Sequence, residues 1–289
     1  MKLIAIDLDG TLLAIDGSIS EANRQAIYRA QEQGHRIAIC SGRALLDIQG
    51  ILQKNQIEAA VIAGNGATIY NGKILKQLAI KSEILQKLLD LAESLNLYHE
   101  VYTNEGIFGK EEGRNLLEEE RDQLLARDPH LDKKIFDLKI GIQFSQHHMR
   151  LVPDLRKIPF TEFVPYKFFV YSFHAEKRQQ FYREISSMED ISITSGTGEV
   201  LEVGNKQANK GFGLQYLANY YKIPLTNTIA IGDNLNDLSM FKVSGISIAM
   251  ENGHEEAKRV ADYVTKSWDE DGVAHALEKF VLRSWAEVL

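Results

Sequence analysis

The chain begins with MKLIAIDLDGT, residues 1–11, in which a short apolar run ends in two acidic residues. A continuous apolar run of this length is typical of a strand that is buried on both faces of a sheet. Asp7 and Asp9 follow at the carboxyl end of that run, and Asp9-Gly10 is also a common turn signal. The stretch therefore predicts a buried first strand over residues 2–7 whose end carries two carboxylates.

The same alternation of strand and helix signals continues through the first 80 residues and returns in the tail. Ser20 is a suitable N-cap for a helix that ends before Gly34. The pattern predicts strands over residues 36–40, 59–63, 228–231 and 246–249, and further helices that end near residue 54 or span 210–221, 235–243, 254–261 and 269–282. Strands that alternate with helices favour parallel pairing with right-handed crossovers. We therefore expect an α/β fold with a doubly wound parallel sheet.

The middle of the chain has a different pattern. It predicts helices over residues 83–95, 111–127 and 175–188 and strands over 135–145 and 168–174, and three of the five prolines fall between 153 and 165. A length of 289 residues also favours about two domains. We therefore expect an α+β cap domain over 83–190, inserted into a core formed by 1–82 and 191–289.

Composition and charge exclude several classes of protein. The chain has 33 Lys and Arg against 40 Asp and Glu, a net charge of −7, which argues against nucleic acid as a partner. No apolar run approaches the roughly 18 residues of a membrane helix, and the first residues do not resemble a signal peptide. The single cysteine, Cys40, allows no internal disulfide and is expected in the core. These features favour a cytoplasmic protein without a membrane partner.

Polar groups follow three of the predicted strands, at the point where each strand ends. These groups are Asp7 to Thr11 after the first strand, Ser41-Gly42-Arg43 after the second, and Gly232-Asp233 followed by Asn236-Asp237 after the strand at 228. Ligands of open parallel sheets bind at the carboxyl ends of the strands. If these strands are neighbours, their ends form one acidic pocket. Each motif taken alone is also explained as a turn or a helix N-cap, because Asp and Asn favour both.

Clustered carboxylates repel one another unless a cation or a proton lies among them. Carboxylate and carbonyl oxygens suit Mg²⁺, which keeps several waters and bridges to phosphate. A lysine ammonium can neutralise carboxylates and hold a phosphoryl oxygen. Lys210, at the start of a predicted helix, and Lys206 are both candidates for that lysine.

Taken in order, these motifs resemble those of the haloacid dehalogenase (HAD) superfamily of phosphotransferases. The similarity is to the Cof-type, sugar-phosphatase-like branch, which has a HAD-like Rossmannoid core and a large α/β cap. Its motifs DxDGT, Ser or Thr after the second strand, Lys, and GDxxND correspond here to Asp7-Leu8-Asp9-Gly10-Thr11, Ser41, Lys210 and Gly232-Asp233-Asn234-Leu235-Asn236-Asp237. Gly64-Asn65-Gly66-Ala67 also resembles the NGA turn of that branch, and Gly211 after Lys210 favours this lysine. The resemblance covers the whole chain.

The resemblance implies a role for each matching residue. Asp7 would be the nucleophile that forms an aspartyl-phosphate, and Asp9 the general acid and base. Mg²⁺ would be held by Asp7, the backbone carbonyl of Asp9, and Asp233, with Asp237 supporting the metal or Lys210 from behind. The phosphate oxygens would be bound by Leu8, Ser41, Gly42, Lys210 and Asn236.

These roles imply a Mg²⁺-dependent phosphatase that hydrolyses small phosphate monoesters, with sugar phosphates as the substrates expected for the branch. An acid two residues after the nucleophile supports ester hydrolysis or phosphoryl transfer over dehalogenation. A sugar phosphomutase is the main alternative, and a non-catalytic phosphoacceptor or binding protein is a further one. No residue pattern in 83–190 specifies the substrate.

Overall fold

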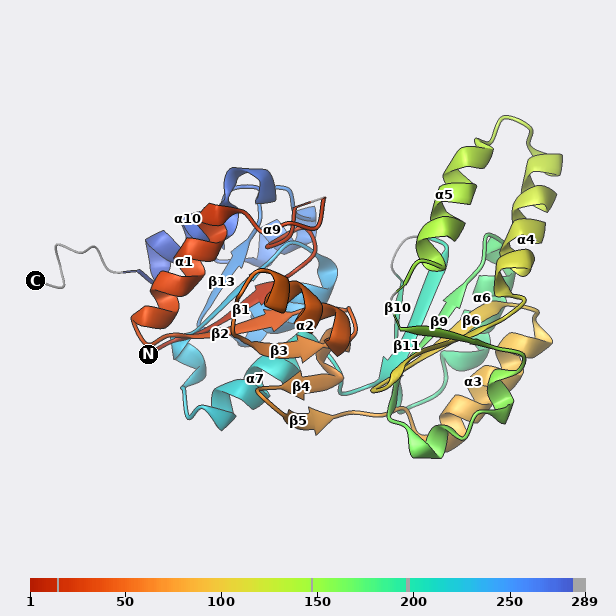
Figure 1. Ribbon diagram of the computed structural model, residues 1–289, viewed down its shortest axis with the longest axis horizontal. Coiled ribbons are helices and arrows are strands. Elements are labelled where there is room, and N and C mark those ends of the chain that lie inside the picture. Colours follow the sequence, from red (N-terminus) through yellow and green to blue (C-terminus); the bar gives the residue numbers. More distant parts are fainter. Residues whose placement is uncertain (15, 147, 196–197, 283–289) are drawn as a thin grey trace, which may run out of the picture. The chain divides into compact units, whose positions relative to one another are not determined.

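The computed structural model describes residues 1–14, 16–146, 148–195 and 198–282, and the chain divides into two compact units. The first unit comprises Met1–Gln77 and Ala208–Leu289, and the inserted unit comprises Leu78–Gln207 (Figure 1). The first unit is thus built from both ends of the chain. In the part of the chain that is described, no helix is long and apolar enough to cross a membrane.

In its described part, the first unit contains an eight-stranded sheet with the order β14-β13-β12-β1-β2-β3-β4-β5. The six strands from β14 to β3 are parallel, and β4 and β5 are antiparallel additions at one edge. The strands are β1 (Leu3–Asp7), β2 (Arg36–Cys40), β3 (Ala60–Ala63), β4 (Thr68–Tyr70), β5 (Ile74–Gln77), β12 (Thr228–Gly232), β13 (Ile246–Ala249) and β14 (Tyr263–Val264).

Helices cover both faces of this sheet, as expected for a doubly wound fold (Figure 1). The core on one face includes side chains of α1 (Glu21–Glu32), α2 (Leu45–Lys54) and α10 (Gly272–Phe280). The core on the other face includes side chains of α7 (Lys210–Tyr220), α8 (Leu238–Val243) and α9 (Glu255–Val260). Short 3₁₀ turns are formed by η1 (Gly64–Gly66), η4 (Leu225–Asn227), η5 (Leu235–Asp237) and η6 (Trp268–Glu270).

The first strand lies at the centre of this sheet. All five residues of β1 are buried, because β12 and β2 flank it and the helix layers cover its two faces. Ile6 is in register with Ile231 of β12, and Asp7 is in register with Cys40 of β2. The three strands are parallel, so the residues that follow them meet at one edge of the sheet. Cys40 is fully buried, as expected, and burial raises the pKa of its thiol.

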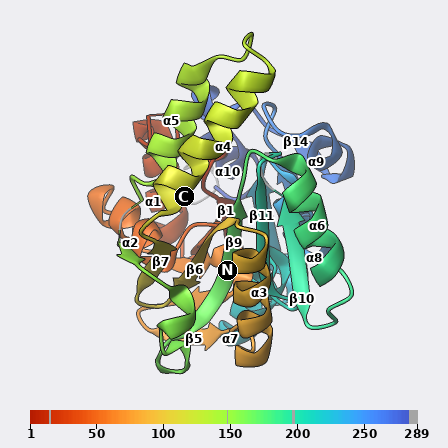
Figure 2. The same cartoon turned by 90° about the vertical axis from the view of Figure 1, so that its right-hand side faces the viewer.

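The inserted unit contains a mostly antiparallel sheet with the order β10-β11-β9-β6-β7-β8, in which only β7 and β8 pair in parallel within the described residues. The strands are β6 (Tyr98–Thr103), β7 (Gly106–Lys110), β8 (Met149–Val152), β9 (Pro165–Tyr171), β10 (Ile191–Ser195) and β11 (Val200–Asn205). Helices α3 (Ser82–Ser94) and α6 (Ala175–Ile185) contribute to a common hydrophobic core with this sheet (Figure 2). The other elements are α4 (Gly113–Arg127), α5 (Lys133–Gln143), η2 (Leu155–Lys157) and η3 (Phe160–Glu162).

The boundaries of the inserted unit lie further out than the expected 83 and 190. Its sheet includes β10 and β11, which pair with each other and, through β11, with β9, so these two strands do not belong to the parallel core. At the other end, the Ile80 N–H donates to the Pro165 carbonyl at 2.7 Å, which ties residue 80 to the inserted unit.

The strand expected over 135–145 is wrong, since α5 occupies Lys133–Gln143. Asp132 caps this helix by accepting a hydrogen bond from the Lys134 N–H at 2.9 Å. The expectation arose because apolar residues at 138, 140 and 142 alternate as in a strand. Leu138 and Ile142 are exposed, however, and only Ile140 of the three is buried.

Candidate active site

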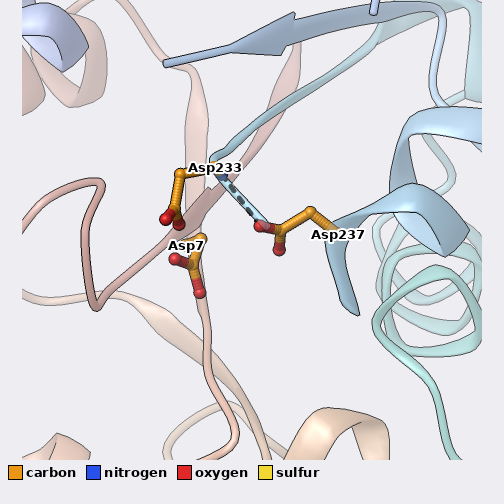
Figure 3. Close-up of side chains that lie close together, drawn as sticks. All are labelled: Asp7, Asp233 and Asp237. Carbon is orange, nitrogen blue, oxygen red and sulfur yellow. Dashed lines mark hydrogen bonds between the residues drawn. The ribbon is translucent and has the colours of Figure 1, made fainter. Parts of the chain in front are cut away.

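Three carboxylates converge at the carboxyl edge of the parallel sheet. Asp7 ends β1, Asp233 follows β12, and Asp237 closes η5. Each offers one carboxylate oxygen, and these oxygens lie within 4.8 Å of one another. Figure 3 shows the three side chains close together, with the Asp237 carboxylate hydrogen-bonded to the backbone at Asp233. The pairing of β1 with β12 brings together two acids that are more than 200 residues apart in the sequence.

Lys210 completes this cluster from the start of α7. Its Nζ donates to Asp7 Oδ1 at 2.5 Å and to Asp237 Oδ1 at 2.6 Å, and its side chain is fully buried. Lys206, the other candidate, is exposed and precedes α7 in the inserted unit. The structure therefore places Lys210 against the carboxylates.

The helix that carries Lys210 is held in place by small residues. Asn209 is its N-cap, and the Asn209 Oδ1 accepts a hydrogen bond from the Phe212 N–H at 2.8 Å. A Cβ atom added at Gly211 would lie 2.3 Å from the Ser239 carbonyl oxygen. A Cβ atom added at Gly213 would lie 2.4 Å from Cγ2 of Ile62 in β3. A larger residue at Gly211 would push α7, and with it Lys210, away from α8, and a larger residue at Gly213 would push it away from the sheet.

Three carboxylates lie close together in this cluster, and the Lys210 ammonium bonds two of them, Asp7 and Asp237. Burial raises the pKa of Asp7 well above its ordinary value, an effect that Lys210 opposes and that Asp237 and Asp233 increase. Burial also raises the pKa of Asp233. For Lys210, burial disfavours the charged form, but the carboxylates of Asp237 and Asp7 outweigh it and raise the pKa. Because the site holds more acid groups than bases, a cation fits it better than a further anion does.

The three acids of the cluster differ in how many of their oxygens already accept hydrogen bonds. The Asp237 Oδ1 accepts from Lys210, and its Oδ2 accepts from the N–H groups of Asp233 and Asn234, both at 2.9 Å. Both oxygens of Asp237 are thus supplied with donors. Asp7 and Asp233 are therefore the better candidates for direct contact with a metal ion, and their oxygens are the hard donors that a divalent cation prefers.

Asp233 is oriented by the loop that follows β1. The Thr11 hydroxyl donates to Asp233 Oδ1 at 3.1 Å. Gly10 has a left-handed φ of 80°, and a Cβ atom there would lie 2.6 Å from Asp233 Oδ2. The Asn252 side chain donates to the Gly10 carbonyl at 2.9 Å. The DxDGT sequence thus supports Asp233 through its Gly and Thr.

The side chain of Asp9 lies outside the carboxylate cluster. It forms a bidentate ion pair with Arg43, in which Nε is 2.9 Å from Oδ2 and Nη2 is 2.6 Å from Oδ1. The Ser41 hydroxyl also donates to Asp9 Oδ2, at 3.5 Å. Hydrogen bonding to Asp9 raises the pKa of Arg43. Both side chains are about half exposed, so this pair lies at the accessible side of the site.

The remaining candidates lie on the loops around this cluster. Ser41 is buried at the end of β2, where its Oγ accepts from the Arg43 N–H at 3.1 Å, and Gly42 follows it. Leu8 is fully buried, and its carbonyl accepts from the N–H groups of Leu12 and Leu13, which turns the chain after β1. Asn236 is exposed on η5, and its Nδ2 donates to Asn65 Oδ1 at 3.1 Å.

Sequence reasoning assigned no role to Thr11, Asn65 or Asn252, which all contact segments of this site. Thr11 is the last residue of the DxDGT motif, so the motif itself could have indicated that Thr11 lies at the site. Asn65 stands between two glycines, a pattern that is typical of a left-handed turn. Asn252 contacts Gly10 across 242 residues of sequence, and no local pattern predicts such a contact.

Comparison with known proteins identifies the family. A sequence model of the haloacid dehalogenase-like hydrolases matches residues 4–277. Phosphatase YwpJ of Bacillus subtilis (strain 168) is 35% identical over 283 residues, which cover 96% of this chain and 99% of that protein. YwtE of the same organism, named 5-amino-6-(5-phospho-D-ribitylamino)uracil phosphatase, is 35% identical over 290 residues, which cover 99% of this chain and 100% of that protein.

A solved structure, that of a haloacid dehalogenase-like hydrolase from B. subtilis, matches with a TM-score of 0.80 and 34% identity over 97% of this chain and 100% of the other. The chain therefore belongs to the haloacid dehalogenase-like hydrolase family, and within that superfamily it is a phosphatase. The resemblance drawn from the four motifs and the α/β doubly wound fold are both confirmed.

Proposed function

We propose that this enzyme hydrolyses small phosphate monoesters in the presence of Mg²⁺, through a covalent phosphoryl group on Asp7. The observation that carries the proposal is the position of Asp7. It ends the central strand of the sheet, 2.5 Å from the buried ammonium of Lys210 and beside Asp233. A carboxylate held in this way is fixed in place for attack on phosphorus, and phosphoryl transfer demands mainly positioning and charge neutralisation.

The reaction has two displacements. In the first, an Asp7 carboxylate oxygen attacks phosphorus, the bond from phosphorus to the substrate oxygen breaks, and Asp9 gives a proton to the departing alcohol. In the second, Asp9 takes a proton from water, the water oxygen attacks phosphorus, and the bond to Asp7 breaks to release inorganic phosphate. Asp9 lies at the accessible side of the site, beside Ser41, and for this role its carboxyl group must leave the ion pair with Arg43 and carry the proton.

The proposed metal ligands are Asp7, Asp233 and the backbone carbonyl of Asp9, with Asp237 holding Lys210 from behind. The excess of carboxylates and the oxygen donors support Mg²⁺ as the ion. When bound, Mg²⁺ supplies positive charge that offsets repulsion between these carboxylates and the phosphate.

Donors for the phosphoryl oxygens come from helix α7 and from three loops at this edge. We assign the Lys210 ammonium at the start of α7, the Ser41 hydroxyl, the Asn236 amide and the N–H groups of Leu8 and Gly42. The loops that carry the last four follow β1, β2 and β12, which are adjacent in the sheet. Fixed donors aimed at developing negative charge stabilise a phosphoryl-transfer transition state.

We propose sugar phosphates and related polyol phosphates as the substrates, and the inserted unit as the domain that selects among them. The name of the relative YwtE supports including 5-amino-6-(5-phospho-D-ribitylamino)uracil in the first panel. The partner is then a small phosphate ester, with no part for nucleic acid or a membrane, and the net charge of −7 agrees with this.

The test measures release of inorganic phosphate from a panel of sugar and polyol phosphates, with Mg²⁺ and again with EDTA. We expect release that stops with the chelator and returns with added Mg²⁺. Intact mass spectrometry of acid-quenched protein should show one added phosphoryl group in the wild type and none in Asp7→Asn. Conversion of a sugar phosphate into its positional isomer without phosphate release would instead identify a phosphomutase.

A further inference from the structure

The short turn η1 (Gly64–Gly66) links the segments to which we assign phosphate binding. It follows β3 and is joined to the loop after β2 by two backbone hydrogen bonds. The Asn65 N–H donates to the Ser41 carbonyl at 2.9 Å, and the Gly64 N–H donates to the Arg43 carbonyl at 2.9 Å. The turn therefore fixes the backbone on both sides of Gly42.

The side chain of Asn65 reaches a second segment. Its Oδ1 accepts a hydrogen bond from the Asn236 Nδ2 at 3.1 Å. The same amide packs against Gly42, because a Cβ atom added at Gly42 would lie 3.2 Å from Nδ2 and 3.3 Å from Oδ1 of Asn65. One side chain thus lies between the loop after β2 and the turn η5 that carries Asn236.

The turn also contacts the segment that carries Lys210. Gly66 has a φ of 99°, and a Cβ atom there would lie 2.1 Å from the carbonyl oxygen of Asn209, the N-cap of α7. Asn65 itself has a left-handed φ of 53° and ψ of 36°. Asn tolerates this conformation better than most residues with a Cβ atom, because its short polar side chain bonds locally. Gly66 therefore allows the close approach of the Asn209 carbonyl, and Asn65 tolerates the left-handed backbone of the turn.

We propose that Asn65 is a positioning residue for phosphate binding, whose amide sets the distance and orientation between Gly42 and the side chain of Asn236. This inference rests on the proposed function. Asn236 is exposed and has several rotamers open to it, so a fixed acceptor at Asn65 preorganises its amide. Asn65 acts through its neighbours and need not touch the phosphate.

The test compares Asn65→Gly with Asn65→Ala. Glycine accepts the left-handed backbone without strain, so Asn65→Gly removes the amide alone, whereas Asn65→Ala also strains the turn. We expect Asn65→Gly to lower kcat/KM by about tenfold, the lower end of what loss of a supporting hydrogen bond costs. The inhibition constant of inorganic phosphate should rise by a similar factor, with a near-wild-type melting temperature. Asn65→Ala should show the same kinetic loss and a lower melting temperature.

Asn96→Gly is the matched control, because Asn96 also has a left-handed φ, of 50°, and belongs to the inserted unit, whereas all residues assigned to this site belong to the first unit. It makes the same chemical change at the same backbone conformation, and its kcat/KM should stay within about twofold of wild type, as expected for a residue that is not assigned to the site.

A double-mutant cycle with Asn236→Ala tests the route of action. If Asn65 acts through Asn236, Asn65→Gly should have little further effect on kcat/KM or on phosphate inhibition in the Asn236→Ala protein. The inference is overturned if the effects of the two substitutions on kcat/KM and on phosphate inhibition are fully additive. It is also overturned if the Asn65→Gly protein equals the wild type in both constants. In either case an active wild type still supports the proposed function. A wild type that neither hydrolyses phosphate esters nor binds phosphate overturns both.

Discussion

Both units of this protein bury carboxylates, and the cluster around Asp7 and the carboxylate of Glu100 have partners of different kinds. In the first unit, Asp7 and Asp237 share the ammonium of Lys210, and Asp233 lies beside them. In the inserted unit, the fully buried Glu100 has uncharged donors around it. It accepts hydrogen bonds from the Tyr98 hydroxyl, from Gln143 Nε2 at 2.7 Å and from Gln146 Nε2 at 3.3 Å.

This difference distinguishes Glu100, a structural carboxylate, from Asp7, the proposed nucleophile. Burial raises the pKa of Glu100, and its hydrogen-bond donors oppose that rise. Each of its oxygens has a donor, so the group is satisfied without any ion. Burial raises the pKa of Asp7 as well, but two neighbouring carboxylates raise it further. Of these two groups, the cluster in the first unit has more carboxylates than cations, and this is the property that metal-dependent phosphoryl transfer uses.

The largest expected effect comes from changing one carboxylate to its amide in each unit. Asp7→Asn should lower kcat by on the order of 10⁴-fold or more, because the amide cannot serve as the nucleophile. Glu100→Gln makes the same chemical change in the inserted unit and should leave kcat within about twofold, because Glu100 is fully buried and its oxygens are occupied by donors of its own unit. Release of inorganic phosphate measures both.

Circular dichroism of both variants provides the control, since each should retain the spectrum of the folded wild type. A folded Asp7→Asn protein with wild-type turnover would remove Asp7 as the nucleophile. Equal losses of turnover in the two folded variants would show that the comparison between the units does not separate chemistry from structure.

Much of the parallel core could be predicted from the sequence, because its signals are local. The apolar run before Asp7 and the runs before Ser41 and Asp233 are buried strands that end in polar groups, and all three are adjacent in the sheet. The ends of the inserted unit could not be read in this way. β10 and β11 follow the helix α6, and only the long-range pairing of β11 with β9 assigns this pair of strands to the inserted unit.

The helix α5 shows a second limit. Its apolar residues at 138 and 142 point to solvent, and an exposed apolar residue carries no signal that distinguishes it from a buried one. In the site, the motifs identified the acids and the lysine, but side-chain contacts such as Asp9 with Arg43 and Asn65 with Asn236 depend on rotamers and loop packing. Motif spacing places residues at one edge of a sheet and does not determine which side chains touch there.

A smaller effect concerns the metal and the stability of the fold. Mg²⁺ at about 100 times its dissociation constant should stabilise the wild type by about 2.7 kcal/mol, because it binds the folded state alone. Asp233→Asn should lose most of this stabilisation, since it removes a proposed ligand, whereas Glu100→Gln should keep it. Thermal unfolding with Mg²⁺ and with EDTA measures the stabilisation of the wild type, of Asp233→Asn and of Glu100→Gln. Equal stabilisation of wild type and Asp233→Asn would place the ion elsewhere.

The smallest expected effect is the pH dependence of stability that Glu100 contributes. Its pKa is raised in the folded state, so the folded protein holds the proton more tightly than the unfolded chain, in which a glutamate has a pKa of about 4.3. The stability from this proton is fully present below the unfolded pKa and is lost as the pH rises through the folded pKa. Glu100→Gln has no proton to lose, so the free energy of unfolding of the wild type should fall relative to that of Glu100→Gln as the pH rises.

The slope of that difference can reach about 1.4 kcal/mol per pH unit, the value for one proton. Urea unfolding of the two proteins in EDTA, from about pH 4.3 upward, measures it. The acids of the first unit titrate in both proteins and cancel in the difference, so the slope belongs to Glu100. A difference that does not change with pH would mean that the donors around Glu100 offset its burial completely. Glu100 and the cluster around Asp7 would then differ in the number of carboxylates that lie together. They would also differ in whether burial changes the pKa, which would sharpen the contrast between them.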